Sequence, residues 1–220
     1  MEPDITVLGQ VLVACGARID GLGSRRLVIH GVRSLEPIDT TIIPDRIEAA
    51  TFAAAAVITG GSITLERVIP DHFEASLRKL EEAGATVVRE HDEVTVSGRG
   101  RPQAVDVTTQ VFPGFPTDMQ AQMMAVASIA DGASVIEDTI YLDRFSHVPE
   151  LARLGAKIEL KGNVAVVKGV ERLSGAPVMA TALVAEGETR ISRIYHLDRG
   201  YEKFDRKLTQ LGARVERVQE

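Results

Sequence analysis

Two aspartates that could act as general bases stand where predicted helices begin. Asp118 lies in the run FPTDMQAQ at 115–122, and Asp45 lies in the run PDRIE at 44–48. A carboxylate can take a proton from a hydroxyl group. Asp is also a preferred helix N-cap, and the Thr-x-x-Gln spacing inside the first run fits a capping box. From the residues alone, capping is the favoured interpretation of both aspartates.

Two arginines could bind an anionic group. Arg199 lies between Asp198 and a glycine, and a guanidinium offers the forked donors that suit a carboxylate or a phosphate. A loop salt bridge with Asp198 is an equally good interpretation. Arg144 follows Asp143, and adjacent charges usually form a surface ion pair. Ile140, just before them, has the character of a strand residue.

Composition limits the classes of function. The net charge of -6 disfavours a nucleic-acid partner, although a local basic pocket for an anionic ligand stays possible. No spacing of Cys, His, Asp and Glu suggests a metal site, and no glycine-rich phosphate loop is present. We therefore expect no metal and no cofactor.

The sequence also predicts a cytoplasmic location. Cys15 is the single cysteine, so no disulfide can form within the chain, as suits a reducing compartment. The first residues do not resemble a signal peptide, and the longest apolar segment, at 47–58, is too short to span a bilayer. We expect no membrane partner.

A Gly-Ala motif recurs four times in the same context. In each copy an amphipathic helix is expected to end, the glycine to adopt the left-handed capping conformation, and a strand to begin. The glycines are Gly16, Gly84, Gly155 and Gly212. A recurring spacing of about 70 residues indicates internal repetition. Only 57 residues separate the last two copies, so the third unit is about a dozen residues short.

Each unit has the predicted order β-β-α-β-α, which is an α/β fold. The first two strands of each unit form a predicted hairpin, and two helices alternate with one further strand. The predicted second hairpin strands are 26–30, 93–96 and 164–167; the first helices are 45–59 and 118–130; the following strands are 62–66 and 134–137; the second helices are 73–83 and 148–154.

The first helix of each unit is rich in small residues, as in the run AAAA at 53–56. Such slim helices can be apolar on most sides, so we expect them inside, with the sheets wrapped around them. In unit three the corresponding segment is 177–187, where the deficit removes roughly 18 Å of helix. A missing interior helix leaves a void, which destabilises a fold strongly.

Several long runs resemble the enolpyruvyl transferase family, and in particular UDP-N-acetylglucosamine 1-carboxyvinyltransferases. These runs follow one another in the family's order, and the resemblance covers essentially the whole chain. The runs are PDRIE at 44–48, FPTDMQAQ at 115–122, DRFSHVPEL at 143–151, GVERLSGA at 169–176 and IYHLDRGYE at 194–202. The relatives that make the shikimate ester share the fold but lack the FPTDMQ run.

The resemblance implies an inside-out α/β barrel of repeated β-α-β-α-β-β units with helices buried inside, the third unit being truncated here. Residues 1–43 correspond to the C-terminal remnant of the family's first domain, and residues 44–220 to an incomplete second domain. We therefore expect roughly the C-terminal half of such an enzyme.

The resemblance also implies an activity and its site. The family moves the enolpyruvyl group of phosphoenolpyruvate to the 3'-hydroxyl of UDP-N-acetylglucosamine, the first committed step of peptidoglycan synthesis. By position in the family runs, Asp118 is the base, Arg199 contacts phosphoenolpyruvate, and Asp45 lines the site. Asp143 and Arg144 lie in the cleft, and the backbone of residue 140, an isoleucine here, touches the uridine-sugar ligand.

Parts of the family's site are missing from this sequence. The N-terminal Lys-Asn pair and the loop that carries the catalytic cysteine are absent, and Cys15 is expected to be a core thiol. The gap in unit three removes the family's Asp-Leu-Arg-Ala-Ser segment. The alternative to an active transferase is therefore an inactive fragment or a UDP-sugar-binding remnant, and we expect no turnover from this chain alone.

Overall fold

The computed structural model describes residues 2–175, 185–192 and 194–218. Within these residues no helix is both long and apolar enough to cross a membrane. The helices are α1 (Pro3–Ala14), α2 (Arg46–Thr59), α3 (Glu74–Glu82), α4 (Gln120–Ile129), α5 (Val148–Arg153), α6 (Tyr195–Gly200) and α7 (Phe204–Gln210), with 3-10 turns η1 (Pro70–His72) and η2 (Thr117–Met119).

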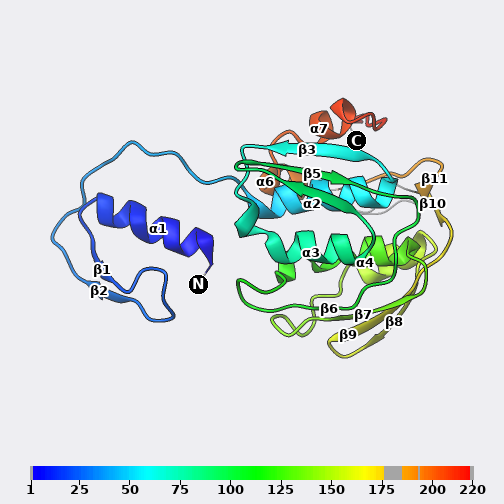
Figure 1. The fold of residues 1–220 in the computed structure, drawn as a ribbon, viewed down its shortest axis with the longest axis horizontal. Helices are drawn as coiled ribbons and strands as arrows, with labels where there is room; N and C mark the ends of the chain where they lie inside the picture. The colour runs from blue at the N-terminus through cyan, green and yellow to red at the C-terminus, as the bar shows by residue number, and fades with distance from the viewer. Residues whose placement is uncertain (1, 176–184, 193, 219–220) are drawn as a thin grey trace.

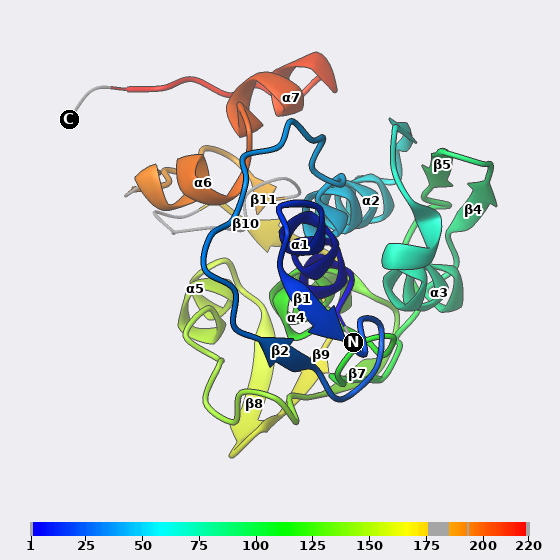
Figure 2. The same ribbon diagram turned by 90° about the vertical axis from the view of Figure 1, so that its left-hand side faces the viewer.

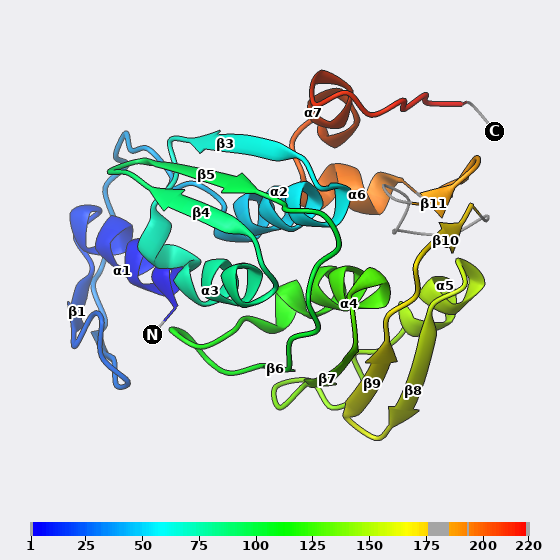
Figure 3. The ribbon, with the colours of Figure 1, turned by 45° about the vertical axis from the view of Figure 1, so that its right-hand side comes forward.

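Small sheets cover a pair of interior helices. One sheet has the order β3-β5-β4 and another the order β6-β7-β9-β8, and α2 and α4 lie between them (Figures 1 and 3). The strands of these two sheets are β3 (Ser62–Glu66), β4 (Thr86–Arg89), β5 (Glu93–Ser97), β6 (Val107–Thr108), β7 (Ala133–Glu137), β8 (Lys157–Lys161) and β9 (Val164–Lys168). The α/β order predicted from the repeats is therefore confirmed.

The predicted hairpins of all three units are present. Strand β4 pairs with β5 and β8 with β9, both antiparallel, and the same holds for β1 (Arg18–Asp20) with β2 (Val28–His30). The strand between the two helices of one unit pairs with the hairpin of the next unit: β3 pairs with β5, and β7 pairs with β9. The β3-β5-β4 and β6-β7-β9-β8 sheets thus each join consecutive repeats.

The four predicted glycine caps are also confirmed. Each glycine has a φ between 95° and 101°, a region that other residues rarely adopt. The amide of the following alanine reaches back to the carbonyl five residues earlier, at 2.8–3.1 Å, as in a Schellman motif. The glycine therefore stops the helix and aims the chain at the next element. The four alanines are Ala17, Ala85, Ala156 and Ala213.

Small side chains let the interior helices pack closely. On α2, Ala50 and Ala53 are fully buried, and Met124 and Val126 of α4 are almost completely so. Both helices carry apolar residues on most of their faces, as expected for elements enclosed on several sides. The core continues into the sheets through Val94 and other inward-facing strand residues.

Residues 2–30 form a smaller unit beside the main body. Figure 1 shows α1, β1 and β2 at one side, joined to α2 by the extended residues 31–45, and Figure 2 shows the same unit facing the viewer. Arg46 at the start of α2 binds Glu2 at 2.5 Å and Asp4 at 3.3 Å across this junction. Ion pairs thus join the two parts at this polar junction.

Three details differ from the sequence-based expectations. Residues 213–218 form no strand after Gly212, because no described strand lies beside them to pair. Cys15 is only partly buried at the end of α1, so it is not a core thiol. Most of the short helix expected at 177–187 lies outside the described residues, and its last part forms β11 (Ala185–Glu186) beside β10 (Leu173–Ser174).

Candidate active site

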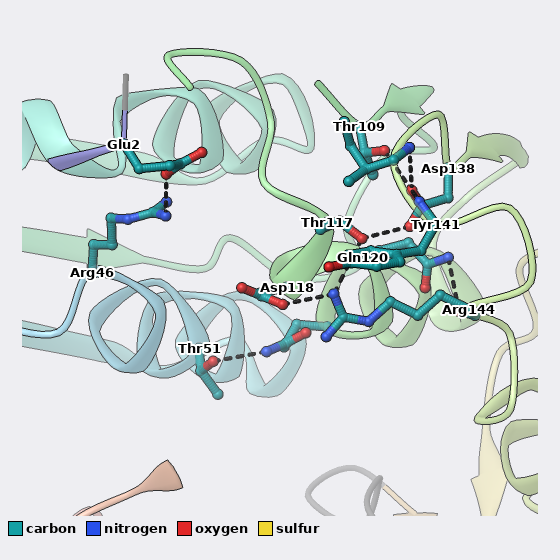
Figure 4. Close-up of polar contacts among 12 residues, drawn as sticks. Glu2, Arg46, Thr51, Thr109, Thr117, Asp118, Gln120, Asp138, Tyr141 and Arg144 are labelled. Atoms are coloured by element: carbon teal, nitrogen blue, oxygen red, sulfur yellow. Dashed lines mark hydrogen bonds and ion pairs between the residues drawn. The ribbon is translucent and has the colours of Figure 1, made fainter. Parts of the chain in front are cut away.

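Asp118 lies in the 3-10 turn that leads into α4, and its carboxylate is bound to Arg144. The ion pair is 2.6 Å long, and the two side chains are 48% and 43% exposed (Figure 4). Arg144 also donates to the hydroxyl of Thr117 at 3.2 Å and lies 5.5 Å above the ring of Tyr141. The carboxylate is thus oriented by a fixed cation while it still faces solvent.

A buried carboxylate, Asp138, anchors this arrangement. It follows β7 and is fully buried, and it accepts hydrogen bonds from the hydroxyls of Thr109 at 2.8 Å and Thr117 at 2.7 Å. It also accepts from the backbone amides of residues 140 and 141, both at 2.9 Å. One side chain therefore ties the 138–144 loop to the turn that carries Asp118 (Figure 4).

The hydrogen bonds determine the charge of Asp138. Burial by itself would raise the pKa of this carboxyl, but the amide of Tyr141, the hydroxyl of Thr117, the amide of Ile140 and the hydroxyl of Thr109 outweigh it. Together they hold the pKa below its usual range. The group is therefore a carboxylate at neutral pH, and its two oxygens stay available as acceptors.

The two candidate aspartates have different structural roles. Asp45 is the N-cap of α2, because its Oδ1 accepts from the amides of residues 47 and 48 at 2.8 and 3.0 Å. Asp118 caps nothing, and neither the turn nor α4 has a side-chain cap. The capping box fails because Thr117 turns to Asp138 while Gln120 is buried and donates to the carbonyl of Arg144 at 3.3 Å.

Ile140 is not a strand residue, and Asp143 and Arg144 do not form the ion pair with each other that their adjacency suggests. Ile140 lies in a bend after β7, not in a strand, and its side chain is 38% exposed. Its amide is engaged by Asp138. Asp143 is exposed, and Arg144 pairs with Asp118 instead of with its neighbour. The loop thus brings Arg144 to the candidate base.

Arg199 lies on α6 and is not held by Asp198. Asp198 instead binds Arg217 through both oxygens, at 2.6 and 3.0 Å. The guanidinium of Arg199 lies 5.8 Å from the centre of the Tyr195 ring, and the residue is exposed. The alternative of a salt bridge with Asp198 is therefore wrong, and no carboxylate of the described residues binds the Arg199 side chain. Its predicted contact with phosphoenolpyruvate is not tested by this geometry.

A cavity of about 350 Å³ opens beside Asp118. Its walls are mainly apolar and come from α2, α4, α5, α6 and α7. Among its polar residues, Thr51 accepts from the amide of Gln122 at 2.9 Å and contacts the hydroxyl of Tyr201 at 3.2 Å. His147 also lines it, and burial, with a smaller contribution from Arg144, lowers the pKa of this imidazole to about 4.

The residues that organise the site, Asp138 and Thr109, were not predicted from the sequence. An acid directly after a strand, followed by a Thr, is a common turn signal, and it could have singled out Asp138. Nothing local predicts that Thr109, which directly follows β6, contributes to the same network. Among the described residues, no group of three His, Cys, Asp or Glu side chains could hold a metal ion.

Comparison with known proteins identifies the family. The family described as EPSP synthase (3-phosphoshikimate 1-carboxyvinyltransferase) matches residues 1–208, so the chain belongs to this family of enolpyruvyl transferases. It is 50% identical to the UDP-N-acetylglucosamine 1-carboxyvinyltransferases of Myxococcus xanthus (strain DK1622), over 98% of the chain, and of Xylella fastidiosa (strain 9a5c), over 99%. The expected family resemblance is confirmed.

The chain spans about half the length of the relatives it matches, 54% of each. The alignment with the Myxococcus protein extends over 227 positions, more than the 220 residues of the chain, so that relative has residues inside the aligned region that this chain lacks. The crystal structure of the enolpyruvyl transferase NikO from Streptomyces tendae is 30% identical and superposes with a TM-score of 0.82, covering 97% of this chain and 54% of that one. The fold is thus a partial enolpyruvyl transferase fold.

Proposed function

We propose that this chain is the part of a UDP-N-acetylglucosamine 1-carboxyvinyltransferase that binds the UDP-sugar and carries the base. The observation that supports this best is the Asp118–Arg144 pair, anchored through Thr117 and Asp138 at the edge of a large cavity. A carboxylate that caps nothing and faces solvent is free to meet a substrate hydroxyl. The proposed cellular location is the cytoplasm, and the proposed second substrate is phosphoenolpyruvate.

Each proposed residue has a defined role in the enolpyruvyl transfer. The sugar 3'-oxygen forms a bond to the enolpyruvyl carbon, the bond from that carbon to the phosphate oxygen breaks, and inorganic phosphate leaves. The hydroxyl proton must go to a base, and Asp118 is the proposed acceptor. Arg144 orients this carboxylate, and exposed Arg199 is the proposed ligand of the anionic phosphoenolpyruvate.

The other predicted residues have smaller proposed roles. The backbone of Ile140 and the side chain of Asp143 lie in the loop that would face the uridine-sugar ligand. Asp45 is engaged by two helix amides, which favours structure over catalysis at that position. In this proposal the fold is the inside-out barrel with its third unit truncated, divided into residues 1–43 and 44–220.

A second candidate function is an inactive remnant that binds the UDP-sugar without turning it over. It is favoured by the shortened third unit, in which only 57 residues separate Gly155 from Gly212. Phosphate release from phosphoenolpyruvate plus UDP-N-acetylglucosamine separates the two candidates. We expect no release from the isolated chain, and turnover near that of a full-length enzyme would refute this expectation.

Calorimetric titration with UDP-N-acetylglucosamine tests the binding role directly. We expect saturable binding by the wild type and roughly tenfold weaker binding by Asp118→Ala, because hydrogen bonds to charged groups contribute about 1.5–3 kcal/mol. Asp92→Ala, in the exposed turn of the β4-β5 hairpin, is the matched control and should bind like the wild type. Lack of saturable binding by the wild type would contradict the proposal.

A further inference from the structure

The β1-β2 hairpin lacks a neighbour that both other hairpins have. In unit two, β3 pairs with β5, the second strand of the β4-β5 hairpin, and in unit three β7 pairs with β9 in the same way. Among the described residues, β2 pairs with β1 alone, in a two-stranded sheet at one side of the molecule (Figure 1). Such an edge offers unpaired backbone amides and carbonyls to another strand.

The strand registers identify the residue of β2 that such a neighbour would cover. Ile29, Val96 and Val167 hold the same position in their hairpins, because each pairs with the residue three places after a capping glycine. Val96 and Val167 are completely buried, whereas Ile29 is 70% exposed. In units two and three the added strand and an interior helix cover the hairpin, since α2 contacts β5 and α4 contacts β9. The hairpin of unit one has the same apolar position without this cover.

Helix α1 has an uncovered apolar face beside this hairpin. Counted back from the capping glycines, Ile5 and Leu8 match Phe73 and Ser76 at the start of α3. Phe73 and Ser76 are 3% and 1% exposed, whereas Ile5 and Leu8 are 45% and 55% exposed. Positions three apart lie on one face of a helix. Because α3 and β5 both contact α2, the exposed face of α1 and the β2 strand border the place where a helix like α2 would lie.

The two covered hairpins define what fits on the uncovered one. Their cover is a helix of 14 or 10 residues, rich in small side chains, that leads into a strand of five residues. Both helix-strand elements of this chain are already buried in the main body, so a second copy would have to unfold to supply one. A different polypeptide is therefore the favoured occupant.

The charge of the hairpin narrows the choice of partner. Residues 17–33 contain four arginines and one aspartate, a net charge of +3 in a chain whose net charge is -6. The aspartate, Asp20, already pairs with His30 at 2.9 Å. Arg25 and Arg26, just before β2, and Arg33, just after it, are exposed. Acidic residues beside the incoming strand are therefore favoured, because complementary charges speed and orient association.

We propose that α1 and the β1-β2 hairpin are a docking surface for a separate polypeptide that supplies a helix of small residues followed by a strand. The strand adds antiparallel to β2, and the helix covers Ile29 and the exposed face of α1. Main-chain hydrogen bonds give such strand addition its affinity, and a repeat that cannot bury its apolar face alone is stabilised by a stacked neighbour. The surface does not depend on the proposed catalytic residues.

The partner can be tested with a relative of this chain. The match covers 54% of the Myxococcus xanthus protein, so the remaining 46% is a source of further helix-strand elements. The full chain, carrying an affinity tag, is coexpressed with this remaining part, untagged. We expect a complex with one copy of each, measured by native mass spectrometry. Hydrogen exchange of the amides of residues 28–30 should slow roughly tenfold or more in the complex, while exchange in β4 stays unchanged.

Two substitutions locate the surface. Ile29→Asp places a charge where the helix and strand would cover the side chain, so the copurified partner should fall roughly tenfold or more. Leu8→Asp makes the same change on α1 and should act in the same direction. Val88→Asp is the matched control, because Val88 lies on a hairpin strand and is 51% exposed, and it should copurify like the wild type. Since all three positions are exposed, the unfolding midpoint of each variant alone should stay near that of the wild type.

Three outcomes would overturn the docking surface. One is that no partner copurifies with the wild type, and another is a complex that both Ile29→Asp and Leu8→Asp leave intact. Unchanged exchange at residues 28–30 in the complex would place the partner elsewhere on the chain. A dimer of the chain alone that Ile29→Asp dissociates would show that a second copy is the occupant, against the proposal.

Discussion

At the scale of single residues, hydrogen-bond partners separate aspartates that look alike in the sequence. The Asp45 carboxylate accepts hydrogen bonds from two amides of α2, whereas the Asp118 carboxylate forms an ion pair with Arg144. The difference arises because Thr117 donates to Asp138 and so cannot begin the helix as a capping residue. Asp138, a buried acid that no sequence motif indicated, thus engages Thr117, and the Asp118 carboxylate is left to bind Arg144.

The lowered pKa of His147 predicts that the stability of the chain depends on pH. Its pKa in the folded chain is about 4, below the ordinary value of 6.5, because of burial and of Arg144. The unfolded chain then binds the proton more readily, so this contribution is complete above pH 6.5 and is lost as the pH falls toward 4. We expect a loss of about 3 kcal/mol in the free energy of unfolding over this range.

The measurement is urea unfolding at several pH values for the wild type and for His147→Gln. The variant should lose less stability than the wild type between pH 6.5 and 4. His91→Gln is the control, because the His91 side chain is 99% exposed. A wild-type profile that is parallel to that of His147→Gln would contradict the assigned role.

At the scale of elements, the start of α2 gives a direct test of the capping role. Asp45→Ala removes the acceptor for two amides and should destabilise the chain by about 1 kcal/mol. Asp45→Asn keeps a cap of similar strength, so its unfolding midpoint should stay close to that of the wild type. Chemical denaturation of the three proteins provides the comparison.

The same pair of variants bears on function. If Asp45 is structural, Asp45→Asn should leave UDP-N-acetylglucosamine binding unchanged. A large loss of binding in Asp45→Asn, with stability retained, would show that the carboxylate charge itself acts in the site.

At the scale of the whole molecule, the polar junction around Arg46 joins residues 2–30 to the main body. Its guanidinium binds Glu2 and Asp4, and the amide of Phe112 donates to Glu2 at 3.3 Å. We expect Arg46→Ala to speed amide hydrogen exchange throughout α1 and the β1-β2 hairpin, while exchange in α2 and α4 stays slow. Arg33→Ala, at an exposed position between the two parts, is the control.

This experiment also tests the predicted division at residue 43. Two domains should exchange as separate cooperative units once the junction is weakened. Equal acceleration in α1 and α4 would instead indicate a single cooperative unit and would contradict that division.

The sequence by itself determined the local elements of this protein. The hairpins, the four glycine caps and the alanine-rich interior helices follow from turn chemistry, from the φ that glycine permits and from the size of side chains. These causes act within a few residues of the chain. The predicted strand after Gly212 failed because a strand also needs a partner, which local sequence does not supply.

Only the tertiary structure decided which polar groups meet. The network of Asp138 joins Thr109, Thr117 and the loop that brings Arg144 to Asp118, and these residues come from parts of the chain that are far apart in the sequence. Hydrogen bonds and ion pairs depend on distances across the fold, which residue types and spacing do not fix. The cavity likewise arises from how α2 and α4 pack against the shortened third unit.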